Sequence, residues 1–321
     1  MLAASFTLLA GLVVLVAGGE FLVRGAVSLA ERAGLSQLLI GLTVVAFGTS
    51  APELVASVEA ARSGAPGIAW GNIIGSNLAN SLLIMGLAAV IYPLAVERRP
   101  LWRDAGLGLA ATAALYGCAL AGVVGVVEGL AAIGLLLAYL IYAYRSERQS
   151  GAAEHQARMD SAAPGGSTPA QTPVWKSTLF LLGGLLGIGL GGHWLVSGAV
   201  DIAALAGLSE TVIGLSVVAI GTSLPEAVTA VIAAMKKASA VALGNVLGSN
   251  IFNLLLIGGV TAIVSPGSVP TELLSFGLPM LIAVSVLLLL FATTNRRVGR
   301  REGGTLLAVF AAQIGYSVWM G

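Results

Sequence analysis

The sequence predicts an all-α membrane protein in which ten transmembrane helices form two inverted five-helix repeats. Three observations lead to this prediction. Hydrophobic residues make up 57% of the 321 residues and charged residues only 10%, with a mean hydropathy of +0.95, whereas soluble domains carry about 25% charged residues. Apolar segments long enough to span a membrane recur along the whole chain. Two polar motifs also occur twice at one fixed spacing.

Ten segments are long and apolar enough to be membrane spans. They cover about residues 3–30, 36–61, 67–91, 102–121, 125–144, 176–201, 209–234, 240–264, 272–292 and 303–320. The first segment has no basic leader and exceeds the length of a signal peptide, so we expect a transmembrane helix there.

The internal repeat is defined by the two motifs. Residues 48–53 read Gly-Thr-Ser-Ala-Pro-Glu, and residues 221–226, which lie 173 positions later, read Gly-Thr-Ser-Leu-Pro-Glu. Residues 71–77 read Gly-Asn-Ile-Ile-Gly-Ser-Asn, and the same shift leads to Gly-Asn-Val-Leu-Gly-Ser-Asn at residues 244–250. The motifs lie in helices 2, 3, 7 and 8, and their Gly, Pro and Ser residues predict that these helices are broken there.

The two halves are joined by a polar segment. Residues 1–145 form the first predicted repeat and residues 175–321 the second, while residues 146–174 are rich in Ser, Gly, Ala, Pro, Gln and charge, as is typical of a mobile linker. Placing the N-terminus outside puts nearly all Lys and Arg residues on the cytoplasmic side, except Arg62 and the intramembrane Arg24. We therefore expect a multi-pass protein of the plasma (cell inner) membrane, with both termini outside and a cytoplasmic linker. Because each half has an odd number of spans, the two halves enter the membrane from opposite sides, and the repeats are therefore inverted.

Glu53 and Glu226 are the residues around which a function is expected. A carboxylate within the bilayer costs several kcal/mol unless it has a partner or faces a water-filled cavity. No Lys or Arg occurs in their segments away from the ends, so bound cations are the simplest source of the missing positive charge. Inverted symmetry would bring the two side chains face to face, and their two charges match one divalent ion or a few monovalent ones.

The neighbouring polar residues are hard oxygen donors. Pro52 and Pro225 lack an N–H group, and with the nearby glycines they loosen the chain, so the carbonyl groups near Ala46 and Ala219 can become ligands. Oxygen donors without thiolate or imidazole suit Na⁺ and Ca²⁺. Packing between membrane helices explains any single Ser or Asn, but it does not require a repeated glutamate. The side-chain donors are Thr49, Ser50, Ser76, Asn77 and Asn80, with Thr222, Ser223, Ser249, Asn250 and Asn253 at the equivalent positions.

Composition argues against other kinds of site. The single Cys118 rules out a disulfide within the chain, and two histidines are too few for a histidine metal cluster. We expect no cofactor, no nucleic acid and no obligate protein partner, with the lipid bilayer as the surroundings. Glu20 lies one turn before Arg24 in the first segment, a spacing that predicts an ion pair.

At these motifs the chain resembles the cation/Ca²⁺ exchanger superfamily, and prokaryotic Na⁺/Ca²⁺ exchangers in particular, with that family's alpha-repeats at about residues 36–91 and 209–264. The resemblance implies a transporter rather than an enzyme, in which Na⁺ influx drives Ca²⁺ extrusion by alternating access at a midplane site. It implies that Ca²⁺ is held by Glu53, Glu226, Thr49 and Thr222. It also implies that the Na⁺ sites are completed by Ser50, Ser76, Ser223, Ser249 and the carbonyl oxygens of Ala46 and Ala219.

Two alternatives stay open at this point. Some relatives carry Asp where this chain has Asn253, the equivalent of Asn80, and the amide argues against K⁺ cotransport. An H⁺/Ca²⁺ antiporter is the first alternative, although that branch has a different first motif. A remote alternative is an intramembrane hydrolase that uses Ser50 or Ser223 with His193, but one histidine cannot serve two symmetric serines.

Overall fold

The computed structural model describes residues 2–33, 35–95, 98–122, 124–161, 173–205, 219–295 and 297–320. The secondary structure of these residues is helical, apart from the two-residue antiparallel strands β1 (Leu94–Ala95) and β2 (Arg297–Val298), and short turns join the helices. Six described helices are long and apolar enough to cross a membrane, or seven when one bent pair counts as a single span. The structure therefore confirms a mostly helical membrane protein, in which shorter or more polar helices occupy the other predicted segments.

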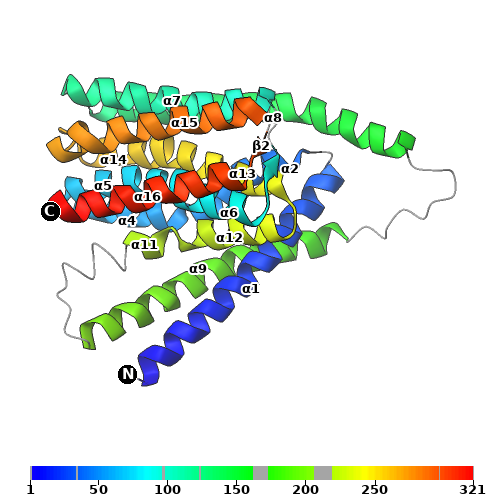
Figure 1. Ribbon diagram of the computed structural model, residues 1–321, viewed down its shortest axis with the longest axis horizontal. Coiled ribbons are helices and arrows are strands. Elements are labelled where there is room, and N and C mark those ends of the chain that lie inside the picture. Colours follow the sequence, from blue (N-terminus) through cyan, green and yellow to red (C-terminus); the bar gives the residue numbers. More distant parts are fainter. Residues whose placement is uncertain are drawn as a thin grey trace.

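The helices follow the predicted segments in order (Figure 1). Those of the first half are α1 (Leu2–Ala33), α2 (Gln37–Ile40), η1 (Gly41–Val45), α3 (Ala46–Thr49), α4 (Ala51–Arg62), α5 (Pro66–Leu78), η2 (Ala79–Ile84), α6 (Met85–Ile91), α7 (Arg98–Leu120) and α8 (Val126–Ser161). Those of the second half are α9 (Val174–Leu205), α11 (Ala219–Thr222), α12 (Leu224–Met235), α13 (Ser239–Ile251), η4 (Phe252–Ile257), α14 (Gly258–Val264), η5 (Leu273–Gly277), α15 (Leu278–Asn295) and α16 (Arg300–Met320).

The first motif breaks its helix in both halves, as predicted. Ser50 leaves the helical conformation at φ −83° and ψ 5°, and the segments on either side of it meet at a 44° bend. Ser223 separates α11 from α12 with nearly the same angles, φ −87° and ψ 2°. A proline follows two residues later in each case, within the first turn of the next helix, where its missing N–H costs no hydrogen bond.

The second motif does not break its helix, and the prediction for helices 3 and 8 was wrong. Residues Pro66–Ile91 and Ser239–Val264 each form one continuous span. The helix instead widens to π-helical hydrogen bonding in η2 and η4, which begin just after the motif. Because the motif contains no proline, every residue in it keeps its N–H, and the hydrogen bonds can shift register without a gap. These two spans are 72% and 78% buried over their most apolar part and form the centre of the bundle.

α1 and α9 pack against each other in antiparallel fashion (Figure 1). Three glycines on each helix, spaced by seven residues, let the two backbones touch, since a Cβ atom at any of them would lie 2.3–2.6 Å from a backbone nitrogen of the other helix. Residue numbers rise along α1 while those of their contact partners fall along α9, as expected of antiparallel helices. The glycines of α9 are those of α1 shifted by the 173-residue offset of the repeat. The contacts are Gly11–Leu195, Gly18–Ile188 and Gly25–Leu181, with Gly184–Leu22, Gly191–Leu15 and Gly198–Leu8.

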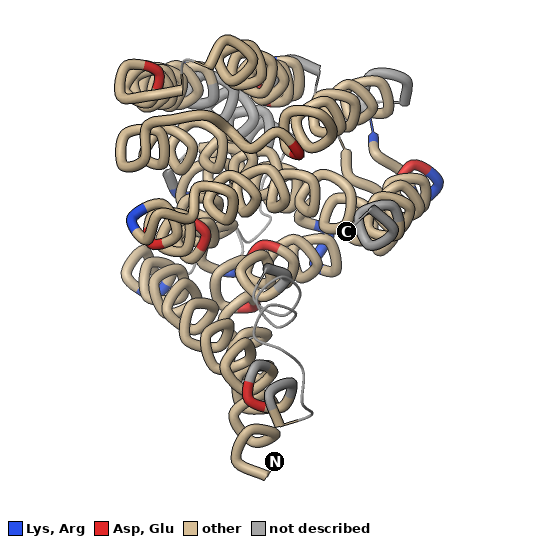
Figure 2. The backbone as a smooth tube through the Cα atoms, turned by 90° about the vertical axis from the view of Figure 1, so that its left-hand side faces the viewer, with Lys and Arg blue, Asp and Glu red and all other residues tan. Residues whose placement is uncertain are grey.

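The positions of the helix ends agree with an odd number of helices running through the bundle in each half. The two chain ends lie at one end of the bundle, while the end of α8 and the start of α9 lie at the other (Figure 1). Most of the backbone carries uncharged residues, and the charged ones are scattered (Figure 2). α8 continues as a helix to Ser161, so it reaches into the segment predicted as a linker, and the predicted linker residues 162–172 lie outside the described residues.

Candidate functional site

The two repeated glutamates belong to one site, because each accepts a hydrogen bond from the opposite half. Ser50 Oγ donates to Glu226 Oε1 at 2.9 Å, and Ser223 Oγ donates to Glu53 Oε1 at 3.4 Å. These two hydrogen bonds are equivalent under the 173-residue offset. Ser223 Oγ also lies 3.5 Å from Ser76 Oγ, which adds the neighbouring helix α5 to the site. The first motif of each half therefore meets the first motif of the other.

Both carboxylates are buried, and each keeps one oxygen without a partner. Glu53 and Glu226 are each 1% exposed. Within the described residues, Oε2 of each glutamate has no hydrogen-bond partner, and no ion pair joins either side chain to a basic residue. A buried ionised carboxylate needs such a partner. The arrangement thus presents two buried oxygen atoms to a cation.

The local sequence places each glutamate in the first turn of a new helix. The break at Ser50 starts α4, and Glu53 lies three residues later, while Ser223 and Glu226 repeat this arrangement in α12. The free N–H groups of a helix N-terminus favour negative charge there. The broken helices therefore both aim the two glutamates and help to stabilise their charge.

Two asparagines of the second motif hold the glutamate helices in place, and the sequence did not identify them. Asn72 Nδ2 donates to the backbone oxygen of Glu53 at 3.3 Å and to Ser57 Oγ at 2.9 Å. Asn245, its equivalent, donates from Nδ2 to the backbone oxygen of Glu226 at 3.2 Å. The sequence feature that could have identified Asn72 and Asn245 is that they occupy the same position in the two copies of the motif.

Thr49 of the first motif and Ala46, two residues before that motif, both have hydrogen-bond partners. Thr49 Oγ1 donates to Asn245 Oδ1 at 3.2 Å and lies 3.3 Å from the Ala46 carbonyl oxygen, which also accepts from the Ser50 N–H at 3.0 Å. The Ala46 carbonyl is therefore hydrogen-bonded in this structure. In the second half, Ala219 begins α11 and Thr222 ends it, with the threonine half-buried.

The remaining predicted donors lie on the central spans. Asn80 and Asn253 are each the second residue of a π-helix, and both are buried. η2 packs against α12, which carries Glu226, and η4 packs against α4, which carries Glu53. Within the described residues, Ser249 Oγ, Asn80 Oδ1 and both side-chain polar atoms of Asn253 have no hydrogen-bond partner.

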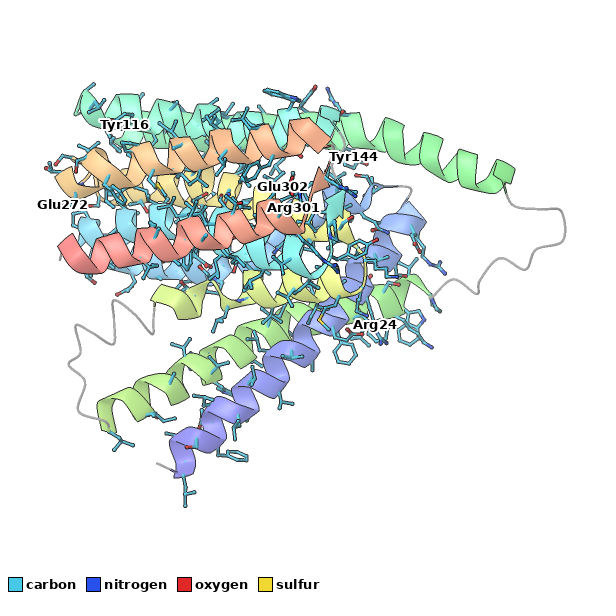
Figure 3. All side chains as sticks on the ribbon, viewed as in Figure 1. Arg24, Tyr116, Tyr144, Glu272, Arg301 and Glu302 are labelled. Atoms are coloured by element: carbon cyan, nitrogen blue, oxygen red, sulfur yellow. The ribbon has the colours of Figure 1, made fainter. Side chains whose placement is uncertain are left out.

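The Glu20–Arg24 ion pair predicted from the sequence is present, and it has a third member. Arg24 Nε lies 2.6 Å from Glu20 Oε1, and Lys236 Nζ, at the end of α12, lies 2.6 Å from the same oxygen. Figure 3 shows Arg24 where α1 meets the rest of the bundle. This cluster joins α1 to the helix that carries Glu226.

Other kinds of site find no support in the described part of the chain. It contains no group of three or more His, Cys, Asp or Glu side chains that could hold a metal ion. The hydroxyl groups of Ser50 and Ser223 donate to glutamates, while His193 is exposed on α9. Hydroxyl, amide and carboxylate oxygens are the ligands that Na⁺ and Ca²⁺ prefer.

Comparison with known proteins places this site in context. The family model described as "Sodium/calcium exchanger protein" matches residues 3–146 and 176–319. The chain is 36% identical over 324 residues to "Putative antiporter CaxA" of Alkalimonas amylolytica, covering 98% of each chain. It is 33% identical to "Sodium/calcium exchanger MaX1" of Methanosarcina acetivorans, covering 95% of each chain.

A solved structure is similar over nearly the full length. The sodium-calcium exchanger NCX_Mj, soaked with Na⁺ and Ca²⁺, superimposes with a TM-score of 0.85 at 29% sequence identity, covering 98% of both chains. The arrangement of helices described above is therefore shared with a protein of that name.

Proposed function

This chain belongs to the sodium/calcium exchanger protein family, and we propose that it is a secondary active antiporter that exchanges Na⁺ for Ca²⁺ across a membrane. The observation that carries this proposal is the reciprocal pair of hydrogen bonds between Ser50 and Glu226 and between Ser223 and Glu53. It joins two buried carboxylates, which have no basic partner among the described residues, into one site shared by both repeats.

The two ions would share the glutamates and differ in the other oxygen ligands. Ca²⁺ takes about 6–8 oxygen atoms, and the two glutamates would supply the two charges that balance it. The unpartnered oxygens of Glu53, Glu226, Ser249, Asn80 and Asn253 support this assignment. The Ca²⁺ ligands proposed are Glu53, Glu226, Thr49 and Thr222. The Na⁺ sites would use the same two glutamates and would be completed by Ser50, Ser76, Ser223, Ser249 and the carbonyl oxygens of Ala46 and Ala219, with Asn80 and Asn253 beside them.

Shared ligands make the transport an exchange. Because the same glutamates would serve both ions, Na⁺ and Ca²⁺ cannot occupy the site together, and binding of one requires release of the other. Each ion would be released on one side of the membrane at a time. We propose that α1 and α9 slide as a unit across the central spans. The most apolar parts of α1 and α9 are only 33% and 28% buried, compared with 72% and 78% for the central spans.

The proposed architecture has ten transmembrane helices in two inverted repeats, residues 1–145 and 175–321, joined by a cytoplasmic linker at residues 146–174. The antiparallel contacts between α1 and α9, and the position of both chain ends at one end of the bundle, support it. Both termini would lie outside the plasma (cell inner) membrane.

Transport by reconstituted protein tests the proposed coupling. Purified protein in proteoliposomes should take up radiolabelled Ca²⁺ when an outward Na⁺ gradient is imposed, and a pH gradient without Na⁺ should drive no uptake. Uptake driven by the pH gradient alone would show that the coupled ion is H⁺. Absence of uptake under either gradient would contradict Ca²⁺ antiport.

A further inference from the structure

A cavity with polar groups in its lining lies in the bundle, and none of the ion ligands proposed above lines it. It has a volume of about 20 Å³ and lies between α5, η2, α13 and η4 on one side and α7 and α15 on the other. Every lining residue is buried or half-buried. The sequence grouped Asn77 and Asn250 with the ion ligands, but the structure places them here. The polar lining residues are Asn77, Ser81, Asp104, Thr112, Asn250 and Ser285.

The cavity lies across the axis that relates the two halves. Most of its lining residues form pairs separated by the 173-residue offset of the repeat, so each half contributes the same positions. Such positions meet only where the repeats face each other about their common axis. The pairs are Asn77 with Asn250, Ser81 with Leu254, Gly108 with Leu281, and Thr112 with Ser285.

The two paired asparagines each present an unpartnered acceptor. Asn77 Nδ2 donates to the Ile73 carbonyl at 2.6 Å, and Asn250 Nδ2 donates to Ser81 Oγ at 2.8 Å. In both side chains Oδ1 is buried and has no hydrogen-bond partner in the described part of the protein. Asn77 is itself 0% exposed. Two buried acceptors without a donor cost free energy comparable to two lost hydrogen bonds.

The charge in the cavity wall is already balanced. Asp104 is fully buried, forms an ion pair with Arg103, and accepts a hydrogen bond from Tyr139 Oη at 2.7 Å. A cation in the cavity would therefore add a positive charge that no neighbouring described group compensates, and a buried uncompensated charge is costly. A neutral donor suits the cavity better.

We propose that this cavity binds one water molecule, which donates one hydrogen to Asn77 Oδ1 and the other to Asn250 Oδ1. A site of about 10–15 Å³ or more, with two to four polar partners, holds a water. Water also has two equivalent O–H groups, so it matches two equivalent acceptors placed across a two-fold axis. This bound water would be a bridge between the first and the second repeat.

The bridge has a consequence for the ion site, and this step rests on the proposed function. Asn77 lies two residues before η2 and Asn250 two residues before η4, and the second residues of these π-helices are Asn80 and Asn253. A water that ties the two helices together at this level would position both amides in the exchange site.

A high-resolution crystal structure of the full chain tests the water directly, independently of transport. A solvent peak within about 3.2 Å of both Oδ1 atoms is expected, with no anomalous signal there after soaking with Tl⁺, a substitute for monovalent cations. A cavity without density would overturn the proposal, and so would a Tl⁺ peak, which would identify a cation site.

Paired variants test the roles of the two amides. Asn77→Leu and Asn250→Leu should each abolish the solvent peak and lower the melting temperature. Thr112→Val is the matched control, because the Thr112 hydroxyl lines the same cavity but donates its proton to the Gly108 carbonyl at 2.8 Å. Melting temperatures lowered equally by all three substitutions, or a peak that persists in both leucine variants, would overturn the proposal.

Discussion

Ser50 Oγ lies 2.9 Å from Oε1 of Glu226, a residue 176 positions later in the chain. Its equivalent, the bond from Ser223 to Glu53, is longer at 3.4 Å. The serine of each broken helix therefore orients the glutamate of the other. The site is built from reciprocal contacts between the repeats, and neither repeat can form it alone.

The serine hydroxyls should contribute to ion binding in both halves. A hydrogen bond to a charged group contributes about 1.5–3 kcal/mol, so Ser50→Ala and Ser223→Ala should each weaken the apparent cation affinity by about tenfold or more. The measurement is the concentration dependence of Na⁺-driven Ca²⁺ uptake. Ser63→Ala, an exposed serine just after α4, is the control and should leave the affinity unchanged. Full affinity in both site variants would contradict a role for these hydroxyl groups.

The glycines between α1 and α9 should be intolerant of any side chain. A Cβ atom at Gly18 would lie 2.6 Å from Ile188 N, and one at Gly191 would lie 2.3 Å from Leu15 N. Gly18→Ala and Gly191→Ala should therefore force the helices apart and destabilise the protein by about 1–3 kcal/mol, since overpacking typically costs that much. Thermal unfolding of the purified protein measures the effect.

Two other glycines of α9 provide the matched control for this prediction. A Cβ atom at Gly183 or Gly189 would have no neighbour within 4 Å. Gly183→Ala and Gly189→Ala should therefore leave the melting temperature unchanged or raise it slightly, because alanine favours helix. Equal losses in all four variants would contradict the prediction, because the loss would then not depend on contact between the two helices.

The ion-pair cluster at Glu20 should favour one facing state of the transporter. The 173-residue offset maps Glu20 onto His193 and Lys236 onto Ser63, which cannot form an equivalent ion pair. The ion pair between Glu20 of α1 and Lys236 after α12 therefore has no equivalent between His193 and Ser63 in the other pair of helices. Because these groups are partly exposed, Glu20→Gln should shift the balance of states by only about twofold to fivefold.

Comparison of the two membrane faces measures this shift. The ratio of apparent Ca²⁺ affinities in inside-out and right-side-out vesicles should change in Glu20→Gln and stay at the wild-type value in Glu31→Gln, which alters an exposed glutamate of the same helix. A ratio that is the same in all three proteins would argue against a role of the ion pair in choosing between states.

Proline was a reliable guide to the helix breaks, and glycine was not. The sequence predicted breaks at both motifs from their Gly, Pro and Ser residues. The structure has them at Ser50 and Ser223 in the first motif, where a proline follows and lacks the N–H group that would continue the preceding hydrogen bonds. The sequence wrongly predicted breaks at the second motif, where glycine and serine keep their N–H groups and the helix passes into π-helical geometry. A local motif therefore predicts a break reliably only where a donor is missing.

The contacts that the sequence did not predict depend on the direction of side chains and on distant partners. Repetition singled out Glu53 and Glu226, but it could not tell that Asn77 points into a separate cavity or that Asn72 holds the backbone of Glu53. The partner of Glu20 at Lys236 lies 216 positions away, so no local spacing could reveal it. Such pairings arise only when the helices pack.

Calcium binding by two glutamine variants tests the central claim, that the two buried glutamates hold the exchanged ions. Calorimetric titration of Ca²⁺ into purified protein in Na⁺-free buffer should show binding to the wild type and to Glu59→Gln, which changes an exposed glutamate on the same helix as Glu53. Glu53→Gln and Glu226→Gln should each weaken Ca²⁺ binding by about 100-fold or more, since each removes a charged ligand. Wild-type affinity in either variant would contradict the claim.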